Sequence, residues 1–272
     1  MSDLIPAKNL LPSARLSVSK SKTFADCKKK FKYSYILKLP KKEQDFHIYG
    51  KFVHRVMELF HLHYIEGGSD AQHVVMGQAF KASLEEFKTQ LTKEQKLEAK
   101  ESCTAYLKRL SEEDPAKVPN IYGAEKDFNI ALRDDVTLLG VIDRIQIDHD
   151  GIHHVVDYKT TKNKKYLKND WFQLLAYAYV LHVQDPSITR VRGSYVLIRH
   201  GFEYITETFE LPEILKIKDK FLAYADGMNE EKLWRANPTI LCSWCDFLME
   251  CDEGKDIVSQ RFPSKVYGEV KW

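Results

Sequence analysis

The sequence predicts an α/β or α+β protein with a mixed central β-sheet flanked by helices. Three observations predict this class. Apolar residues recur at helical spacing through roughly the first 110 residues, strand-like alternation follows, and the rest of the chain then alternates helices with strands. The 272 residues allow one large domain or two small ones.

The N-terminal half is predicted to be helical. In the segment 24–35 apolar side chains recur every three or four residues, and Ser19 or Ser21 is placed to cap that helix. Three more helices are expected over these ranges: 49–65, 70–90 and 93–111. Pro115 and Pro119 then interrupt the helical pattern, and the residues between them are predicted to be a connector.

The following part is predicted to form the sheet. Three runs with turn residues between them indicate an antiparallel meander over these ranges: 125–133, 137–148 and 152–159. A helix is expected over about 170–182. Two further strands and a last long helix are expected over these ranges: 191–198, 203–209 and 212–233.

Composition excludes several classes of protein. No apolar run approaches 18 residues, so no transmembrane helix is expected, and the N-terminus lacks the pattern of a secretory signal. Five cysteines are too few, and odd in number, for a disulfide scaffold. We therefore expect a reducing compartment and a cytoplasmic location, in a prokaryotic cell or in the host of a phage. The net charge of +2 by itself predicts no partner.

Two carboxylates are predicted to face each other across neighbouring strands. Asp143 lies in an apolar row of the strand 137–148, and a turn centred on Asp150 places it opposite Asp157. Carboxylates about 5 Å apart repel each other unless a cation lies between them. Lys159 points to the same side as Asp157. Two metal-binding carboxylates and a lysine suit phosphodiester hydrolysis, whereas a plain cross-strand ion pair is the structural alternative.

Three motifs follow in order along this region: Gly140-Val-Ile-Asp143-Arg, Val156-Asp157-Tyr158-Lys159-Thr160 and Gln173-Leu-Leu-Ala-Tyr177. Together they closely resemble the RecB-like branch of the PD-(D/E)XK nuclease superfamily. The resemblance implies a restriction-endonuclease-like core. It also implies that Asp143, Asp157 and the Tyr158 carbonyl bind a divalent metal and that Lys159 is catalytic.

The same resemblance implies further site residues. Gln173 and Tyr177 share a helix face, and in the family this pair faces the active site or DNA; a polar rim residue and a core aromatic are the alternatives. The family also has a metal-binding His on an upstream helix after a Gly-containing turn, and Gly50-Lys-Phe-Val-His54 matches that pattern. An imidazole ligand favours Mn²⁺ over Mg²⁺. Glu125 matches a family acidic position less closely, so a site role and a structural role are equally open.

Three cysteines crowd together near the C-terminus. Cys242-Ser-Trp-Cys245 is followed six residues later by Cys251. Three thiolates in a short loop can share a metal, but a closed site needs a fourth ligand. Spacing alone does not choose between Cys27 and Cys103.

The N-terminal segment contains Leu16-Ser-Val-Ser19, Phe24-Ala-Asp-Cys27 and Phe31-Lys-Tyr33. It resembles the corresponding segment of RecB-like nucleases that carry an iron–sulfur cluster, including AddB-type nuclease domains and CRISPR-associated exonucleases. Many of those relatives have Pro after the first Cys, where this chain has Lys28. The resemblance implies a structural 4Fe–4S cluster on four cysteines: Cys27, Cys242, Cys245 and Cys251. Zinc and free thiols are the alternatives, and Cys103 is expected to be a core residue.

A Lys-rich segment, from Lys20 to Lys42, carries nine Lys and one Asp. Aromatic residues interleave with these lysines, and single-stranded nucleic acid is bound by backbone phosphate contacts together with base stacking. A solvated charged face is the alternative. The pattern favours DNA as a partner, with these nucleic-acid-binding residues: Lys28, Lys29, Lys30 and Lys32.

These expectations together describe a metal-dependent deoxyribonuclease. By resemblance it uses Mg²⁺ or Mn²⁺, acts as an exonuclease on single-stranded DNA or DNA ends, and serves DNA recombination, repair or replication. The alternative is a DNA-binding or adaptor subunit of a recombination or CRISPR-adaptation complex. No helicase P-loop is present in the sequence, so unwinding would need a helicase or recombination partner. Four consecutive segments are expected: a tail at 1–15, a helical part at 16–120, a nuclease core at 121–235 and a cluster segment with a tail at 236–272.

Overall fold

The computed structural model describes residues 12–41, 45–87, 90–112, 119–162, 164, 170–262 and 266. The chain divides into two compact units, and each unit combines segments that are distant in the sequence. Unit 1 comprises Met1–Lys42, Ala131–Leu139 and Asp219–Trp272, and unit 2 comprises Glu43–Ile130 and Gly140–Lys218. These units cut across the four consecutive segments expected above, because packing joins parts of the chain that composition alone keeps separate.

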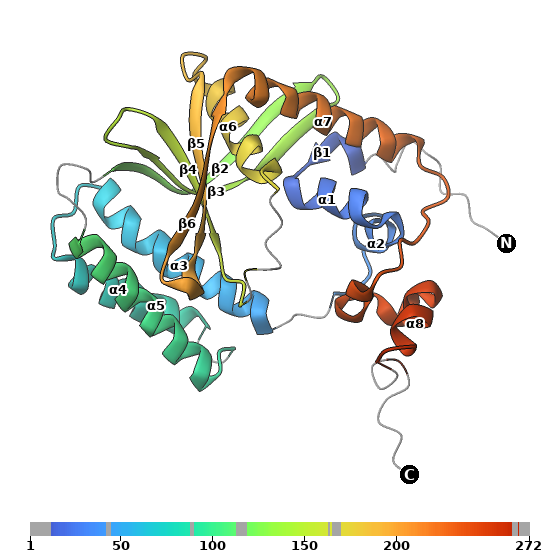
Figure 1. Ribbon diagram of the computed structural model, residues 1–272, viewed down its shortest axis with the longest axis horizontal. Coiled ribbons are helices and arrows are strands. Elements are labelled where there is room, and N and C mark those ends of the chain that lie inside the picture. The colour runs from blue at the N-terminus through green and yellow to red at the C-terminus, as the bar shows by residue number, and fades with distance from the viewer. Residues whose placement is uncertain are drawn as a thin grey trace, which may run out of the picture. The chain divides into compact units, whose positions relative to one another are not determined.

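Three long helices form one layer of unit 2 (Figure 1): α3 (Asp45–Ile65), α4 (Gln72–Phe87) and α5 (Lys93–Glu112). They lie close to the predicted ranges, although residues 88–89 and the predicted connector residue Pro115 are outside the described part of the chain. Val56 and Phe60, on one stripe of α3, share a buried core with Tyr158 of the sheet. Burial of this apolar stripe is what holds the helical layer on the sheet.

The sheet is mixed, as the sequence predicts. Its strands are β1 (Arg15–Leu16), β2 (Asn120–Arg133), β3 (Val136–Ile147), β4 (His153–Lys159), β5 (Arg190–Leu197) and β6 (Glu203–Glu210). The order is β1-β3-β4-β5-β6, with β2 also paired to β3. The pairs β3–β4 and β5–β6 are antiparallel, whereas β1–β3 and β4–β5 are parallel. β1 is absent from the prediction because two residues are too few to show alternation.

Helix α6 (Phe172–Gln184) lies on the other face of the sheet in unit 2 (Figure 1). It connects β4 to β5, which are parallel neighbours and therefore require a crossover connection. Eight of its thirteen residues are buried, which explains its apolar run in place of a narrow stripe. The helix approaches β5 closely, because a Cβ on Gly193 would lie 3.0 Å from the Cβ of Leu174 and 2.7 Å from the Phe209 ring.

Unit 1 contains the N-terminal helical segment and the cysteine-rich segment. Its short elements are η2 (Pro12–Ala14), α1 (Val18–Asp26), α2 (Lys28–Phe31), the π-helical turn η3 (Lys32–Ile36), η7 (Ile240–Trp244), η8 (Leu248–Glu250) and α8 (Asp252–Ser259). The boundary between the units falls within α7 (Leu211–Glu230). Within unit 1, Trp234 stacks on Phe31 with ring centroids 5.8 Å apart, so the segment after α7 packs on the N-terminal helices.

Two local predictions in unit 1 are wrong. The continuous helix expected over 24–35 is interrupted at Cys27, whose backbone is extended and whose Sγ accepts a hydrogen bond from the Lys30 N–H. The first helix begins earlier than expected, because Ser17 caps it in place of Ser19 or Ser21. Helical spacing does not reveal such a break, since residues on both sides of it keep the same period.

No helix in the described part of the chain is both long and apolar enough to span a membrane. The remaining short element of unit 2 is the 3₁₀ turn η6 (Ile198–His200). In unit 2 the strands pack against α3, α4 and α5 on one face and against α6 on the other.

Candidate active site

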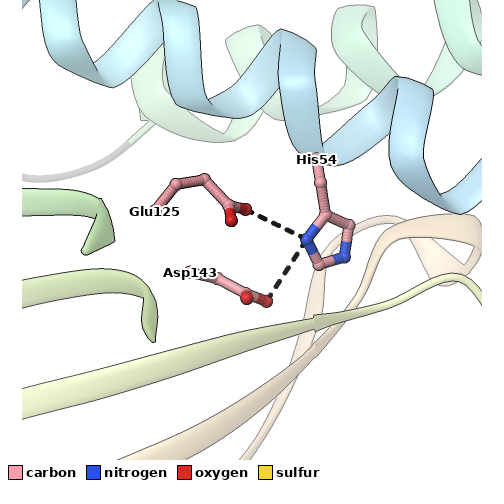
Figure 2. Close-up of side chains that lie close together, drawn as sticks. All are labelled: His54, Glu125 and Asp143. Carbon is pink, nitrogen blue, oxygen red and sulfur yellow. Dashed lines mark hydrogen bonds and ion pairs between the residues drawn. The ribbon is translucent and has the colours of Figure 1, made fainter. Parts of the chain in front are cut away.

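His54 projects from α3 toward two carboxylates (Figure 2). Its Nδ1 lies 3.2 Å from Glu125 Oε1 and 3.6 Å from Asp143 Oδ2. Its Nε2 lies 3.1 Å from the Tyr158 carbonyl oxygen, which can only accept a hydrogen bond. Both ring nitrogens thus face acceptors, an arrangement that favours the imidazolium form. Burial lowers the pKa of His54, but the charges of Asp143, Glu125 and Asp157 outweigh burial and raise the pKa to about 9.

Asp143 lies directly before the residues of β3 that pair with β4. The register pairs Arg144 with Val156, so its continuation sets Asp143 opposite Asp157, as the turn geometry predicts. The Tyr158 N–H donates to Asp143 Oδ2 at 2.7 Å. Burial of Asp143, together with the nearby carboxylates, raises its pKa despite the opposing effect of His54. A buried carboxylate of this kind is stabilised by any cation that binds beside it.

Glu125 reaches this group through an irregularity in β2. The alternation of burial along the strand breaks at adjacent buried residues Gly123 and Ala124, and Glu125 follows with a φ of 43°. Positive φ is uncommon for a residue other than glycine, and such residues occur where a strand bulges and redirects a side chain. The structure thus places Glu125 against His54, whereas the sequence leaves a site role and a structural role equally open.

A chain of polar contacts leads from β4 to α6. Lys159 Nζ lies 2.6 Å from Asp157 Oδ2 and donates to Gln173 Oε1 at 2.9 Å. Gln173 Nε2 in turn donates to the Tyr177 hydroxyl at 2.8 Å. This ion pair joins two residues of β4, so it is not the cross-strand pair named as the structural alternative, and it belongs to a longer chain of polar contacts. Two neighbours fix the position of the Lys159 ammonium.

An open cleft of about 490 Å³ lies beside His54 and Glu125. Residues of α3 and α4 line the rest of it: Gly50, Lys51, Arg55, Glu58 and Phe87. Gly50 lies inside α3, so the Gly-containing turn expected before His54 is part of the helix. A Cβ on Gly50 would lie 3.4 Å from Thr160 Oγ1, which indicates close packing of α3 against the end of β4. Of the group around His54, the cleft is lined by His54 and Glu125.

The side chains of His54, Glu125 and Asp143 fit one divalent cation. Their ligand atoms all lie within 4.8 Å of one another, and they come from three separate elements. One imidazole nitrogen and two carboxylate oxygens suit Mg²⁺ or Mn²⁺, and the imidazole favours Mn²⁺. Asp157 is outside this group and contacts Lys159, although its charge still acts on His54. The Tyr158 carbonyl, the other expected ligand, accepts the hydrogen bond from His54 Nε2.

Four cysteines line one small cavity in unit 1: Cys27, Cys242, Cys245 and Cys251. Two of their sulfur atoms accept backbone N–H groups, Cys27 from Lys30 and Cys242 from Thr239, each at 3.4 Å. The fifth cysteine, Cys103, is buried in α5 of unit 2, where burial raises the pKa of its thiol to about 12. The structure therefore groups the four predicted ligands and separates the fifth thiol from them.

The four predicted DNA-binding lysines lie in or beside α2, next to this cavity. Lys28 forms an ion pair with Glu231, and Lys29 Nζ lies 2.5 Å from Glu253 Oε2. In the part of the chain that the structure describes, Lys30 and Lys32 form no ion pair and thus keep an uncompensated charge. The described part of the Lys-rich segment ends at Lys41, since Lys42 is outside it.

Sequence reasoning missed one buried charge next to the site residues. Arg144 follows Asp143 on β3 but belongs to the other face of the sheet, where it is 2% exposed. The available signal was the row Ile142, Arg144 and Gln146, in which two polar residues occupy a face that packs on helices. A single buried arginine looks unremarkable in a sequence where Lys and Arg are frequent.

Comparisons with known proteins agree with this architecture. The profile of the PD-(D/E)XK nuclease superfamily matches residues 15–252. A crystal structure from Eubacterium rectale, described as a "putative exonuclease", shares 13% identity at a TM-score of 0.52, covering 90% of this chain and 93% of that one. The crystal structure of SSO0001 has the same identity and coverage at a TM-score of 0.35. A comparison with curated proteins found no match.

Proposed function

We propose that this chain, which belongs to the PD-(D/E)XK nuclease superfamily, is a divalent-metal-dependent deoxyribonuclease of the RecB-like branch. One observation carries the proposal: the group His54, Glu125 and Asp143 adjoins the ion pair of Asp157 with Lys159, because Asp143 lies opposite Asp157 in the β3–β4 register. Two neighbouring buried carboxylates destabilise a fold unless a cation compensates them. The arrangement supports a metal-dependent nuclease over a protein that only binds DNA.

The side chains of this group have separable roles in the proposed reaction. A divalent cation held by His54, Glu125 and Asp143 would supply Lewis-acid stabilisation of the charge that develops on the scissile phosphate. Lys159, held by Asp157 and Gln173, presents a positive charge at a defined position, so little reorganisation accompanies the reaction. The same ammonium can orient the attacking water. Tyr177 fixes the Gln173 amide and therefore acts on the reaction only through Lys159.

The proposed substrate is single-stranded DNA or a DNA end, cut in exonuclease mode. The description of the structural neighbour as an exonuclease supports this mode. The cleft beside His54 supports a strand that approaches along α3, where Lys51 lines the wall next to Arg55, which pairs with Glu58 and Glu86. We propose a role in DNA recombination, repair or replication in the cytoplasm. A reducing compartment is consistent with the five free cysteines.

We also propose a structural 4Fe–4S cluster on the four cysteines around the cavity of unit 1. Four thiolates around a single zinc, each at 2.3 Å, lie only about 3.8 Å from one another. Among the described cysteines, no three sulfur atoms lie within 4.8 Å of one another. This wider spacing supports a bulkier group than one zinc ion. The backbone N–H groups directed at Cys27 and Cys242 are of the kind that stabilise cluster sulfurs.

The test of the nuclease proposal is cleavage of end-labelled single-stranded DNA with Mn²⁺, with Mg²⁺ and with EDTA. We expect cleavage only with metal, and a loss of at least about 100-fold in Asp143→Asn and Lys159→Met. DNA binding should survive both substitutions. Lys164→Met is the matched control, because Lys164 pairs with Glu203 at the surface. This variant should cleave DNA as fast as the parent protein. Cleavage in EDTA, or full activity of Lys159→Met, contradicts the proposal, and DNA binding without cleavage under any metal indicates an adaptor.

A further inference from the structure

A second cavity in unit 2, of about 310 Å³, is separate from the active site. It lies among α3, α5 and the strands, on the side of the sheet that carries Arg144, whereas Asp143 belongs to the opposite face. Its inner wall contains Arg144, His61 and Tyr106, all of them buried. Its outer part contains the exposed amides Gln72 and Asn120. The volume is in the usual range for a site that binds a small molecule.

Arg144 is a buried cation that forms no ion pair within the described part of the chain. Its Nη1 donates to the Tyr106 hydroxyl at 3.1 Å and its Nη2 to the Tyr204 hydroxyl at 2.7 Å. Its Nε is buried and has no hydrogen-bond partner, and no carboxylate of the described residues forms an ion pair with it. The rings of Tyr158 and Tyr204 lie 5.7 and 5.9 Å from the guanidinium carbon. Aromatic rings stabilise a cation but do not neutralise it, and an unpaired buried charge is costly.

The donor and acceptor of each hydrogen bond at His61 and Tyr106 follow from the Met57 carbonyl, which can only accept. His61 Nδ1 must donate to the Met57 carbonyl at 2.7 Å, so its Nε2 accepts from the Tyr106 hydroxyl at 2.9 Å. Burial and the charge of Arg144 lower the pKa of His61 to about 3, so the ring is neutral. The Tyr106 hydroxyl therefore donates its hydrogen bond to His61 Nε2 and accepts one from Arg144. Neither residue supplies a negative charge.

Tyr204 differs from Tyr106 in one respect. Its oxygen accepts from Arg144, but no described residue accepts its hydroxyl hydrogen. The cavity lining therefore has one unused donor, the Tyr204 O–H, and it lies beside Arg144, whose Nε–H is unpaired but buried. Phe60, Leu110 and Ile121 give most of the remaining wall an apolar character. A permanent cation and a free hydroxyl inside an apolar cavity are the donor set for an anionic group on an apolar molecule.

We propose that this cavity binds a small organic anion, a carboxylate or a phosphate monoester with an apolar body. The oxyanion contacts Arg144 and Tyr204, and the body lies against Phe60, Leu110 and Ile121. Such a ligand supplies the counter-charge that Arg144 lacks. The site lies on the face of the sheet opposite the Asp143 carboxylate and takes a different ligand from the proposed nuclease site.

The test is calorimetric titration of the full chain with benzoate and with phenyl phosphate, using neutral benzamide as the comparison. EDTA is present throughout, so that the probes cannot bind through a metal at His54. We expect at least one anion to bind at least about tenfold more tightly than benzamide, since hydrogen bonds to charged groups are among the strong ones. The stronger of the two anions identifies the natural oxyanion as a carboxylate or a phosphate ester.

Two substitutions test whether the anion binds in this cavity. Tyr204→Phe removes only the hydroxyl and should lower the affinity for the anion by about tenfold or more. Tyr122→Phe is the matched control, because its hydroxyl contacts His153 on the surface, and it should bind like the parent protein. Equal affinity for benzoate, phenyl phosphate and benzamide overturns the proposal. So does the absence of binding by either anion at 10 mM (roughly the weakest affinity of interest), or equal affinity in the Tyr204 and Tyr122 variants.

Discussion

Metal binding at His54 should release a proton, and the structure sets the size of the effect. Before a cation binds, both nitrogens of the His54 ring face oxygen acceptors, and the surrounding carboxylates raise its pKa to about 9. A metal ligand must be a neutral imidazole, so the cation competes with the proton on Nδ1. The variable to change is therefore the pH at which the protein is titrated with Mn²⁺.

The expected magnitude follows from that pKa. At pH 7 only about 1% of His54 is neutral, so the apparent affinity for Mn²⁺ is about 100-fold weaker than the intrinsic affinity. The affinity should rise about tenfold for each pH unit between about pH 6 and pH 8, and level off near pH 9. At pH 7 each bound ion should release about one proton from His54. Asp143, whose pKa is also raised, adds a further release in the same direction.

The assay is isothermal titration with Mn²⁺ at pH 7 in two buffers that differ in their heat of ionisation. The difference in measured heat gives the number of protons released. His54→Gln is the control, because its side chain retains an oxygen ligand but does not titrate, and its release should fall by about one proton. An affinity that stays constant from pH 6 to pH 8 would refute the reasoning, as would equal proton release by the two proteins.

Three other predictions concern separate parts of the molecule. Tyr177→Phe removes the acceptor of the Gln173 amide, so single-turnover cleavage should slow by about tenfold with the melting temperature almost unchanged; an unchanged rate would mean that Tyr177 has no influence on Lys159. Cys242→Ala should lose bound iron and the visible absorption of a cluster, whereas Cys103→Ala should keep both, and equal iron content in the two variants would count against the ligand set. Gly193→Ala should lower the free energy of unfolding by about 1–3 kcal/mol, because the added Cβ meets Leu174 and Phe209 at 3.0 Å or less. Gly77→Ala in α4, where a Cβ meets nothing within 4 Å, should stabilise by up to about 1 kcal/mol, and similar urea midpoints for the two alanine variants would contradict the packing argument.

Short-range patterns in the sequence predict much of the site. A turn centred on Asp150 is enough to set Asp143 opposite Asp157, because an antiparallel register follows from the position of the turn. The helical period is likewise enough to bring Gln173 and Tyr177 together. In both cases the residues belong to one hairpin or one helix, so local geometry determines their relative position.

Local geometry was not enough where a break or a bulge changes the direction of the chain. Cys27 interrupts a helix whose period continues on both sides, and the sequence shows no Gly or Pro at that point. Glu125 contacts a histidine 71 residues away because β2 departs from regular alternation beside it. The sequence therefore left Glu125 with two equal interpretations.

The sequence by itself determined the class of fold, the opposition of Asp143 and Asp157, and the shared helix face of Gln173 and Tyr177. These depend on periods of two and of 3.6 residues and on the positions of turns, which neighbouring residues encode. Only the tertiary structure decided that Glu125 lies beside His54 and Asp143, that four cysteines share a cavity, and that Arg144 is buried with no ion pair among the described residues. Those properties depend on which distant segments pack together and on what burial removes from water, and neither is encoded within a short stretch of chain.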